Sequence, residues 1–404
     1  MALGAKPHYA QPFFCMTLFF YGGYCIYSSY MVLYLNERGY NAFFCGFVTS
    51  LTFIISVIVQ PLASYLVDTF ISLKNYMLLS TGMLVFLALL AGRTAVNPWI
   101  CIALISAMAI FIMPFGYLLD VWIDSSRELD RSLTYGIVRA GGSVGFGIIS
   151  VAFGYCWVHF PHSIYFPAQA LLFACMFLFL WRFPAIEPKN KCEPSAKKRE
   201  DRGLTFLQSF RILLGSRGYR VIAALFLLYW MSNRPVGSYL ALMIQSRNGN
   251  AELFGWVVGA GAVSEAAVMI FLAARRNYFS VKKMLGLAFL TACLRPVILL
   301  LTTDVVLLFA AQIIQSISFT MYYVSSVETL HRLADPRIRT FSISIGLAFT
   351  NVLGTAIANL AGGWLFDAFG TLPVLLLSTA LTAVNVLLFY ILANGLVSDF
   401  NGCV

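Results

Sequence analysis

The sequence contains few charged residues. Of its 404 residues only 11% are Asp, Glu, Lys or Arg, whereas 60% are hydrophobic. Soluble globular chains carry about 25% charged residues, and disordered chains are poor in the large apolar residues that dominate here. Soluble, fibrous and disordered classes are therefore excluded, and most of the surface is expected to face lipid.

The sequence also lacks the motifs of common catalytic and metal sites. Its nine cysteines fall mostly within apolar runs and form no CxxC pair, so we expect small buried hydrophobes rather than a disulfide or metal framework. No metal-ligand spacing, nucleophile elbow or P-loop is present. These absences predict a protein that is not an enzyme, is not driven by ATP and binds neither metal nor cofactor.

The apolar residues form continuous runs of about the 20 residues that a transmembrane helix needs. The first run is long enough to remain as a span, so no cleaved signal peptide is expected. The predicted fold class is an all-α integral membrane protein with twelve transmembrane helices. The predicted spans are residues 12–36, 43–67, 75–92, 98–122, 133–158, 163–181, 219–244, 252–274, 283–303, 305–327, 340–365 and 371–394.

The positions of the basic residues predict the orientation. With both termini in the cytoplasm, 21 of the 27 Lys and Arg residues fall in inside segments, and only Arg38, Arg93 and Arg247 fall in outside loops. This bias follows the positive-inside rule. It also explains the net charge of +10 without a nucleic-acid partner.

The chain is built from two copies of one unit. When the chain is aligned with itself at a shift of 209 residues, the junction of spans 1–2 falls on the junction of spans 7–8. Residues of the first junction that are identical to the residue 209 positions later are Ser29, Tyr30, Leu33, Arg38, Asn41, Ala42 and Gly46. The predicted domains are an N-terminal six-helix bundle (1–183), a cytoplasmic linker with a short amphipathic surface helix (184–217) and a C-terminal six-helix bundle (218–404). Two pseudo-symmetric six-helix bundles are the layout of major facilitator transporters, whose substrate site lies between the halves near mid-membrane.

Ionisable side chains inside a span cost a few kcal/mol each unless a partner or a water-filled cavity receives them. Asp120 and Arg139 lie at similar distances on either side of the turn between spans 4 and 5, so they are predicted to face each other. Such a pair either pins two helices together or clamps a substrate, with the carboxylate accepting from hydroxyls and the guanidinium donating. Asp124, one turn nearer the cytoplasm, is either a pathway residue or a loop-edge charge.

Three more charged residues lie within the C-terminal spans. Glu265 occupies the middle of span 8 among small residues, and a membrane carboxylate of this kind is a candidate proton carrier. Arg295, beside Pro296 in span 9, is its predicted partner. Arg234 precedes Pro235 in span 7, where the proline is expected to disturb the helix locally, and is a further cavity candidate.

Uncharged residues give weaker signals. Gln315 and Asn351 lie closest to the centres of spans 10 and 11; they either line the cavity or hydrogen-bond between helices. Trp256 and Tyr322 are added as cavity candidates, although most aromatic side chains are expected to face lipid or the membrane interface.

Two stretches in spans 4 and 5 carry a family resemblance. They are Pro114-Phe-Gly-Tyr-Leu-Leu-Asp120 and Tyr135-Gly-Ile-Val-Arg-Ala-Gly-Gly-Ser-Val-Gly-Phe146. They resemble the corresponding helices of lactose-permease-like proton symporters. Nucleoside and phenylpropionate permeases of the same branch share the Tyr-Gly-x-x-Arg and Gly-Ser-x-Gly elements.

The resemblance implies roles for several residues. Asp120, Arg139 and Glu265 are implied to contact the substrate. Phe146 takes the place of a tryptophan that stacks on the sugar, and Arg295 resembles an arginine that assists proton release.

This sequence also departs from that pattern. Gln315 and Ser318 stand where lactose permease has a histidine and a proton-carrying glutamate, and Asn351 stands where it has a lysine. The proton route is therefore expected to differ from that of lactose permease.

These features predict a secondary active transporter that imports a small hydroxylated solute, a sugar or oligosaccharide, together with a proton by alternating access. A nucleoside or aromatic-acid symporter, and a drug or metabolite exporter, are the alternatives; span 5 lacks the proline of an antiporter kink. The expected partners are the solute, H⁺ and membrane lipid. The expected form is a monomer in the inner (plasma) membrane.

Overall fold

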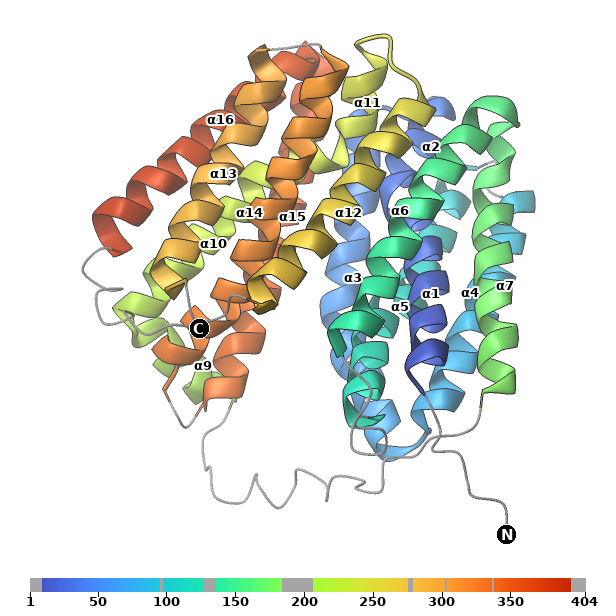
Figure 1. Ribbon diagram of the computed structural model, residues 1–404, viewed down its shortest axis with the longest axis horizontal. Coiled ribbons are helices and arrows are strands. Elements are labelled where there is room, and N and C mark those ends of the chain that lie inside the picture. The colour runs from blue at the N-terminus through green and yellow to red at the C-terminus, as the bar shows by residue number, and fades with distance from the viewer. Residues whose placement is uncertain are drawn as a thin grey trace. The chain divides into compact units, whose positions relative to one another are not determined.

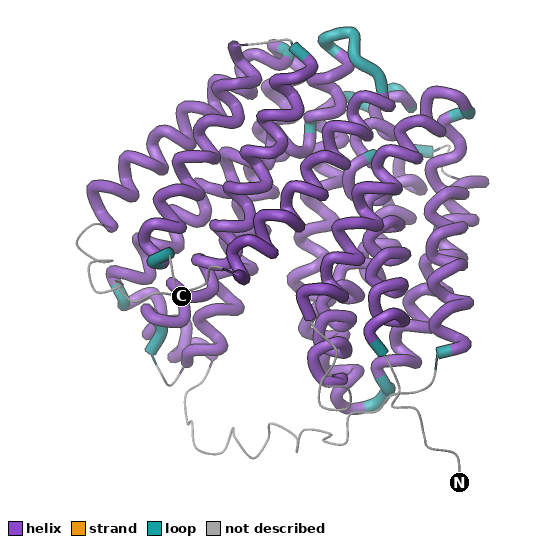
Figure 2. Tube along the Cα trace, in the orientation of Figure 1, coloured by secondary structure: helices purple, strands orange, loops and turns teal. Residues whose placement is uncertain are grey.

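The computed structural model describes residues 9–94, 97–126, 135–183, 206–274, 279–301, 304–335 and 338–393. Over these ranges the chain is helical with short loops (Figure 2). Twelve of the helices in the described ranges have 18 residues or more. They are α1 (Ala10–Ser29), α3 (Ala42–Thr69), α4 (Leu73–Thr94), α5 (Pro98–Ser126), α6 (Tyr135–His159), α7 (Tyr165–Arg182), α10 (Arg217–Ser238), α12 (Ala251–Ala274), α13 (Val281–Leu301), α14 (Val305–Leu333), α15 (Arg339–Phe369) and α16 (Thr371–Leu388).

These long helices correspond one to one with the predicted spans, and Figure 1 colours them in chain order. In the part of the chain that the structure describes, ten of them are long and apolar enough to cross a membrane. Large apolar side chains lie on the outside of the helices; Trp99 is 74% exposed and Leu301 is 82% exposed. Such a surface suits lipid rather than water.

The first span of each repeat is broken, whereas the sequence indicated a disturbance only at Arg234–Pro235. Residues 12–36 form α1 and the short α2 (Met31–Glu37), with the break at Tyr30, and residues 219–244 form α10 and α11 (Leu240–Gln245), with the break at Tyr239. Pro235 lies inside the last turn of α10, before the second break, and removes one main-chain donor there. Near the first break, the Ser28 hydroxyl bonds to the carbonyl of Tyr24 at 2.8 Å, a contact that often bends helices.

The chain forms two compact units that exchange parts of two helices. Unit 1 comprises Met1–Glu37, Ile54–Lys197 and Ala251–Ala262, and unit 2 comprises Arg38–Phe53, Lys198–Asn250 and Val263–Val404. The first half of α12 thus belongs to unit 1, and the first half of α3 belongs to unit 2. The predicted division at the linker stays a prediction.

The predicted surface helix of the linker corresponds to α9 (Phe206–Gly215). Leu213 of α9 is buried in the core of unit 2, whereas Leu214 is 46% exposed, so the helix has the expected amphipathic character. The rest of the linker up to residue 205 lies outside the described residues. Six further basic residues predicted to face the cytoplasm also lie outside the described residues: Lys6, Arg127, Arg131, Arg275, Arg276 and Arg337.

Each unit has its own core. In unit 1, α1 packs against α6 and α7, and α4 packs against α5 and α7. In unit 2, α10 packs against α15 and α16, and α13 packs against α14 and α16. The core of unit 2 is rich in aromatic side chains, among them Phe226, Tyr229, Phe289 and Tyr322.

Candidate functional site

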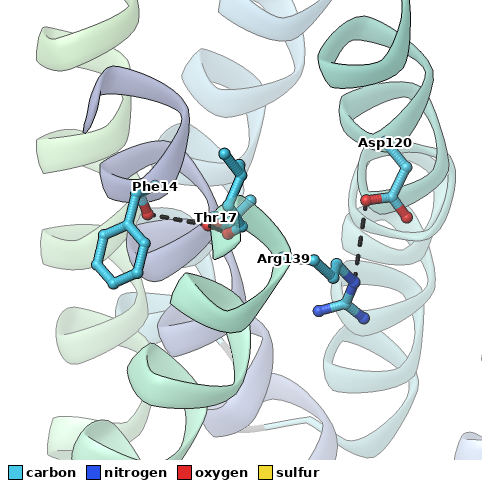
Figure 3. A network of polar contacts seen from close by, with 5 residues as sticks. Phe14, Thr17, Asp120 and Arg139 are labelled. Carbon is cyan, nitrogen blue, oxygen red and sulfur yellow. Dashed lines mark hydrogen bonds and ion pairs between the residues drawn. The ribbon is translucent and has the colours of Figure 1, made fainter. Parts of the chain in front are cut away.

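The predicted pair of opposite charges in spans 4 and 5 is present. Arg139 on α6 faces Asp120 on α5, and its Nε lies 3.9 Å from Oδ1 of the carboxylate (Figure 3). Both side chains are partly accessible, at 27% and 31%. A carboxylate and a guanidinium held side by side offer an acceptor and several donors to a polar ligand.

Contacts between α1 and α6 position the turn that carries Arg139. The Thr17 hydroxyl on α1 donates to the carbonyl of Val138 at 2.8 Å, and it also lies 2.9 Å from the carbonyl of Phe14 (Figure 3). Glycines of the sequence motif make this approach possible: a methyl group on Gly141 would lie 2.6 Å from the Thr17 hydroxyl, and one on Gly145 would clash with the Leu18 carbonyl. Small residues at helix interfaces allow such close packing in membranes.

Tyr21 completes this cluster, and sequence reasoning missed it. The Arg139 guanidinium carbon lies 4.2 Å from the centroid of the Tyr21 ring, within the range of a cation–π interaction. Gly142 leaves room for this stacking, because a methyl group there would lie 2.6 Å from the ring and 2.7 Å from Nη1 of Arg139. Asp120, Arg139 and Tyr21 therefore form one group, which we call the Arg139 cluster.

A second polar group lies in unit 2 around Arg295. This side chain is only 3% exposed, and its two terminal nitrogens donate to the amide oxygens of Gln315 and Gln312 on α14, each at 3.1 Å. Amide oxygens solvate a guanidinium without cancelling its charge. The two glutamines therefore leave Arg295 as a positive centre inside the helix bundle. The predicted pairing of Glu265 with Arg295 stays a prediction.

Tyr229 on α10 lies near three of the charged residues of unit 2. Arg234, Glu265 and Arg295 all lie within electrostatic range of its hydroxyl. Its ring stacks on Tyr322, with the ring centroids 4.0 Å apart. Tyr322, a predicted cavity residue, is buried in this aromatic core, where its hydroxyl accepts a 3.1 Å hydrogen bond from the Trp230 indole.

Arg234 is held between aromatic rings. Its guanidinium carbon lies 4.7 Å from the ring centroid of Trp230 and 4.7 Å from that of Phe53 on α3. Phe53 belongs to the part of α3 that joins unit 2. The sequence indicated a helix disturbance at Arg234–Pro235 but gave no sign of these ring partners, because they come from a distant segment.

Four other predicted site residues lie on α5, α6, α12 and α15. Asn351 on α15 accepts a 3.2 Å hydrogen bond from Thr355 in its own helix, and Phe146 is half-buried on α6. Asp124 is exposed on the last turn of α5, and Trp256 on α12 is 51% exposed. Their roles toward a substrate stay predictions. Among the described residues, no group of three or more His, Cys, Asp or Glu could hold a metal ion.

Comparison with protein families decides the classification. The sequence model of the MFS_1 like family matches residues 14–377, nearly the whole chain. The chain belongs to this family. It is therefore a transporter of the major facilitator superfamily, which confirms the predicted all-α membrane fold and the resemblance based on spans 4 and 5.

Relatives with known names agree with this membership. Maltose permease of Geobacillus stearothermophilus is 25% identical over 389 residues, which cover 95% of this chain and 94% of that protein. The uncharacterized transporter YwbF of Bacillus subtilis (strain 168) is 19% identical over 243 residues, covering 60% of this chain and 58% of that protein.

Solved structures of the same superfamily share the fold. The nucleoside transporter NupG matches with a TM-score of 0.80 at 15% identity, covering 95% of this chain and 98% of that one. A D-xylose–proton symporter matches with a TM-score of 0.73 at 12% identity, covering 95% and 96%. This MFS_1-like protein is therefore a multi-pass membrane transporter, and proteins of its kind bind a small-molecule substrate within the membrane.

Proposed function

We propose that this protein imports a sugar or oligosaccharide together with a proton by alternating access. The observation that carries the proposal is the Arg139 cluster, in which a carboxylate and a guanidinium stand side by side and remain partly accessible. A sugar presents many hydroxyl groups that both donate and accept hydrogen bonds, and this pair satisfies both needs. The similarity to maltose permease over 95% of the chain supports a sugar.

Each residue of the proposed site has a chemical role. Asp120 accepts from sugar hydroxyls, while Arg139 donates and is held in place by Tyr21. Phe146, seven residues after Arg139 and therefore on nearly the same face of α6, offers a ring for stacking on the apolar face of the sugar. Gln315 and Asn351 supply neutral amide contacts in unit 2.

Proton coupling is assigned to unit 2. Glu265 is half-buried in α12 and lies within electrostatic range of Tyr229, as Arg295 does. A carboxylate that meets a guanidinium in one conformation and leaves it in another changes its proton affinity during the cycle, which coupling requires. Asp124, exposed at the end of α5, serves as a pathway residue for the proton, and Arg234 and Trp256 are further cavity residues.

The proposed setting follows from the basic residues. The bias of Lys and Arg toward one side predicts that both termini lie in the cytoplasm, and the proposed location is the inner (plasma) membrane. The functional form is a monomer of the two six-helix repeats 1–183 and 218–404, surrounded by lipid.

A thermal-shift screen of the purified protein tests the substrate class. We expect maltose or a related oligosaccharide to raise the melting temperature by about 2–5 °C at roughly 100 times its Kd, because a ligand that binds only the folded state stabilises it. Arg139→Ala should show a clearly smaller shift at the same concentration, because its binding is weaker. A shift with uridine or with phenylpropionate but with no sugar would instead assign a nucleoside or an aromatic acid.

A further inference from the structure

Tyr30, at the break between α1 and α2, is completely buried. Its hydroxyl donates to the main-chain carbonyl of Ser150 on α6 at 2.6 Å. The Ser150 hydroxyl in turn donates to the carbonyl of Gly255 on α12 at 2.9 Å. Tyr30 therefore stands where α6 meets the first half of α12, within unit 1.

Tyr239 has the same position in unit 2. It is completely buried at the break between α10 and α11. Its hydroxyl donates to the carbonyl of Asn359 on α15 at 2.6 Å and lies 3.2 Å from the carbonyl of Ala42 at the start of α3. The Asn359 side chain donates to the Thr49 hydroxyl of α3 at 3.2 Å. Tyr239 therefore stands where α15 meets the first half of α3.

Glycines allow the helices to meet at Tyr30. A methyl group on Gly154 would lie 2.6 Å from the carbonyl oxygen of Ala251 and 2.9 Å from the Tyr30 hydroxyl. A methyl group on Gly255 would lie 2.8 Å from the same hydroxyl. Any side chain at either glycine would push α6 and α12 apart.

The contact at Tyr239 is built in the same way. A methyl group on Gly363 would lie 2.7 Å from the Tyr239 hydroxyl and 2.6 Å from the carbonyl oxygen of Ala42, and one on Gly46 would clash with the hydroxyl. The helices α3 and α15 therefore meet through glycine as well.

The sequence repeat relates the two contacts residue by residue. The shift of 209 residues pairs Tyr30 with Tyr239, Ala42 with Ala251, Gly46 with Gly255, Ser150 with Asn359 and Gly154 with Gly363. The donor hydroxyl, the acceptor carbonyl and both glycines recur, and so does the 2.6 Å hydrogen bond. In each case the tyrosine meets a half helix from the other repeat: α12 in unit 1 and α3 in unit 2.

We propose that Tyr30 and Tyr239 are a symmetric pair of latches that hold the outer end of the transport path closed. The count of basic residues puts both breaks at the outer ends of their spans. The proposal rests on transport by alternating access and does not depend on which solute is carried.

The chemistry of the latch favours repeated opening. Each hydroxyl bonds to a carbonyl that lies within a helix, so the helix keeps its own main-chain hydrogen bonds when the tyrosine leaves. Once the helices separate, water can replace the carbonyl as the partner of the tyrosine hydroxyl. The net free-energy cost of exchanging one hydrogen bond in this way is small. The glycine contacts supply close packing without a side chain that would have to be rearranged.

Two native cysteines report on the latches. Cys25 and Cys45 are both completely buried, and they lie within electrostatic range of Tyr30 and Tyr239 respectively. In single-cysteine proteins that retain one or the other, the rate of reaction with a membrane-impermeant maleimide in right-side-out vesicles measures outer opening. We expect Tyr30→Phe to speed the reaction of Cys25, and Tyr239→Phe that of Cys45, by about three- to tenfold, the range expected for the loss of one hydrogen bond.

Two other tyrosines provide matched controls. Tyr27 and Tyr219 are also buried, and their hydroxyls donate to the helix carbonyls of Ile105 and Ser342 at 3.0 and 2.9 Å. These bonds end on α5 and on the first turn of α15 rather than where α6 meets α12 or where α15 meets α3, so Tyr27→Phe and Tyr219→Phe should leave the maleimide rates unchanged.

Glycine variants test the latches independently of the hydroxyls. Gly154→Ala should speed the reaction of Cys25 in the same way as Tyr30→Phe, whereas Gly237→Ala, which has open space around it, should not. Unchanged rates in both the tyrosine and the glycine variants would overturn the proposal. An equally faster maleimide reaction in the control variants Tyr27→Phe and Tyr219→Phe would also overturn the proposal. So would a faster reaction that occurs only in inside-out vesicles.

Discussion

Arg139→Ala and Asp120→Ala should each abolish uptake of the substrate and weaken its binding by about 10- to 150-fold. The reason is that each removes a charged hydrogen-bonding group, and hydrogen bonds to charged groups contribute about 1.5–3 kcal/mol. Because both side chains are partly accessible, the folded protein should tolerate either change. Binding by isothermal titration calorimetry and expression level measure the two effects separately.

A second ion pair provides the matched control for this experiment. Arg332 lies 2.6 Å from Glu328 on α14, and these side chains are 23% and 32% exposed, nearly the same as in the Asp120–Arg139 pair. Arg332→Ala should leave substrate binding unchanged. The opposite interpretation, in which Asp120 and Arg139 only pin two helices, predicts that the single variants fail to insert and that the charge-swapped double variant recovers.

Glu265→Gln should keep substrate exchange across the membrane but lose accumulation driven by a pH gradient. Glutamine has nearly the shape of glutamate but does not exchange a proton, so binding and conformational change persist while coupling is lost. Counterflow of labelled substrate measures exchange, and uptake under an imposed pH gradient measures coupling. Arg295→Ala should also uncouple, because it removes the charge proposed to drive proton release from Glu265.

Glu328→Gln is the control for this second prediction. Its carboxylate is already bonded to Arg332 at 2.6 Å within one helix, an arrangement that conformational change between helices leaves intact. We expect normal proton-driven accumulation in this variant. Full accumulation in Glu265→Gln would remove Glu265 from the coupling role.

The main features of the fold could be predicted from the sequence because membrane insertion imposes simple rules. Apolar runs of span length must become helices, since lipid offers no hydrogen-bond partner to the main chain. The positions of Asp120 and Arg139 relative to one short turn were enough to predict that they face each other. The repeat at Tyr30 and Tyr239 could likewise be detected by comparing the chain with itself.

Other features depend on contacts that no local pattern reveals. Tyr21 is one of 20 tyrosines, and only the close approach of α1 to α6 places its ring under Arg139. The sequence left open whether Gln315 hydrogen-bonds between helices and did not indicate Arg295 as its partner. Arg295 bonds to Gln312 and Gln315 of α14, which lie three residues apart and therefore share one face of that helix. The exchange of half helices between the units follows from packing between distant segments and leaves no trace in hydropathy.

The most direct test of proton-coupled sugar import is uptake of radiolabelled maltose by the purified protein in proteoliposomes with a more acidic solution outside than inside. Proton-coupled sugar import predicts accumulation above the external concentration, collapse of that accumulation when a protonophore is added, and no uptake by the Arg139→Ala protein. Accumulation that does not respond to the protonophore, or no maltose uptake at all under the pH gradient, would contradict it.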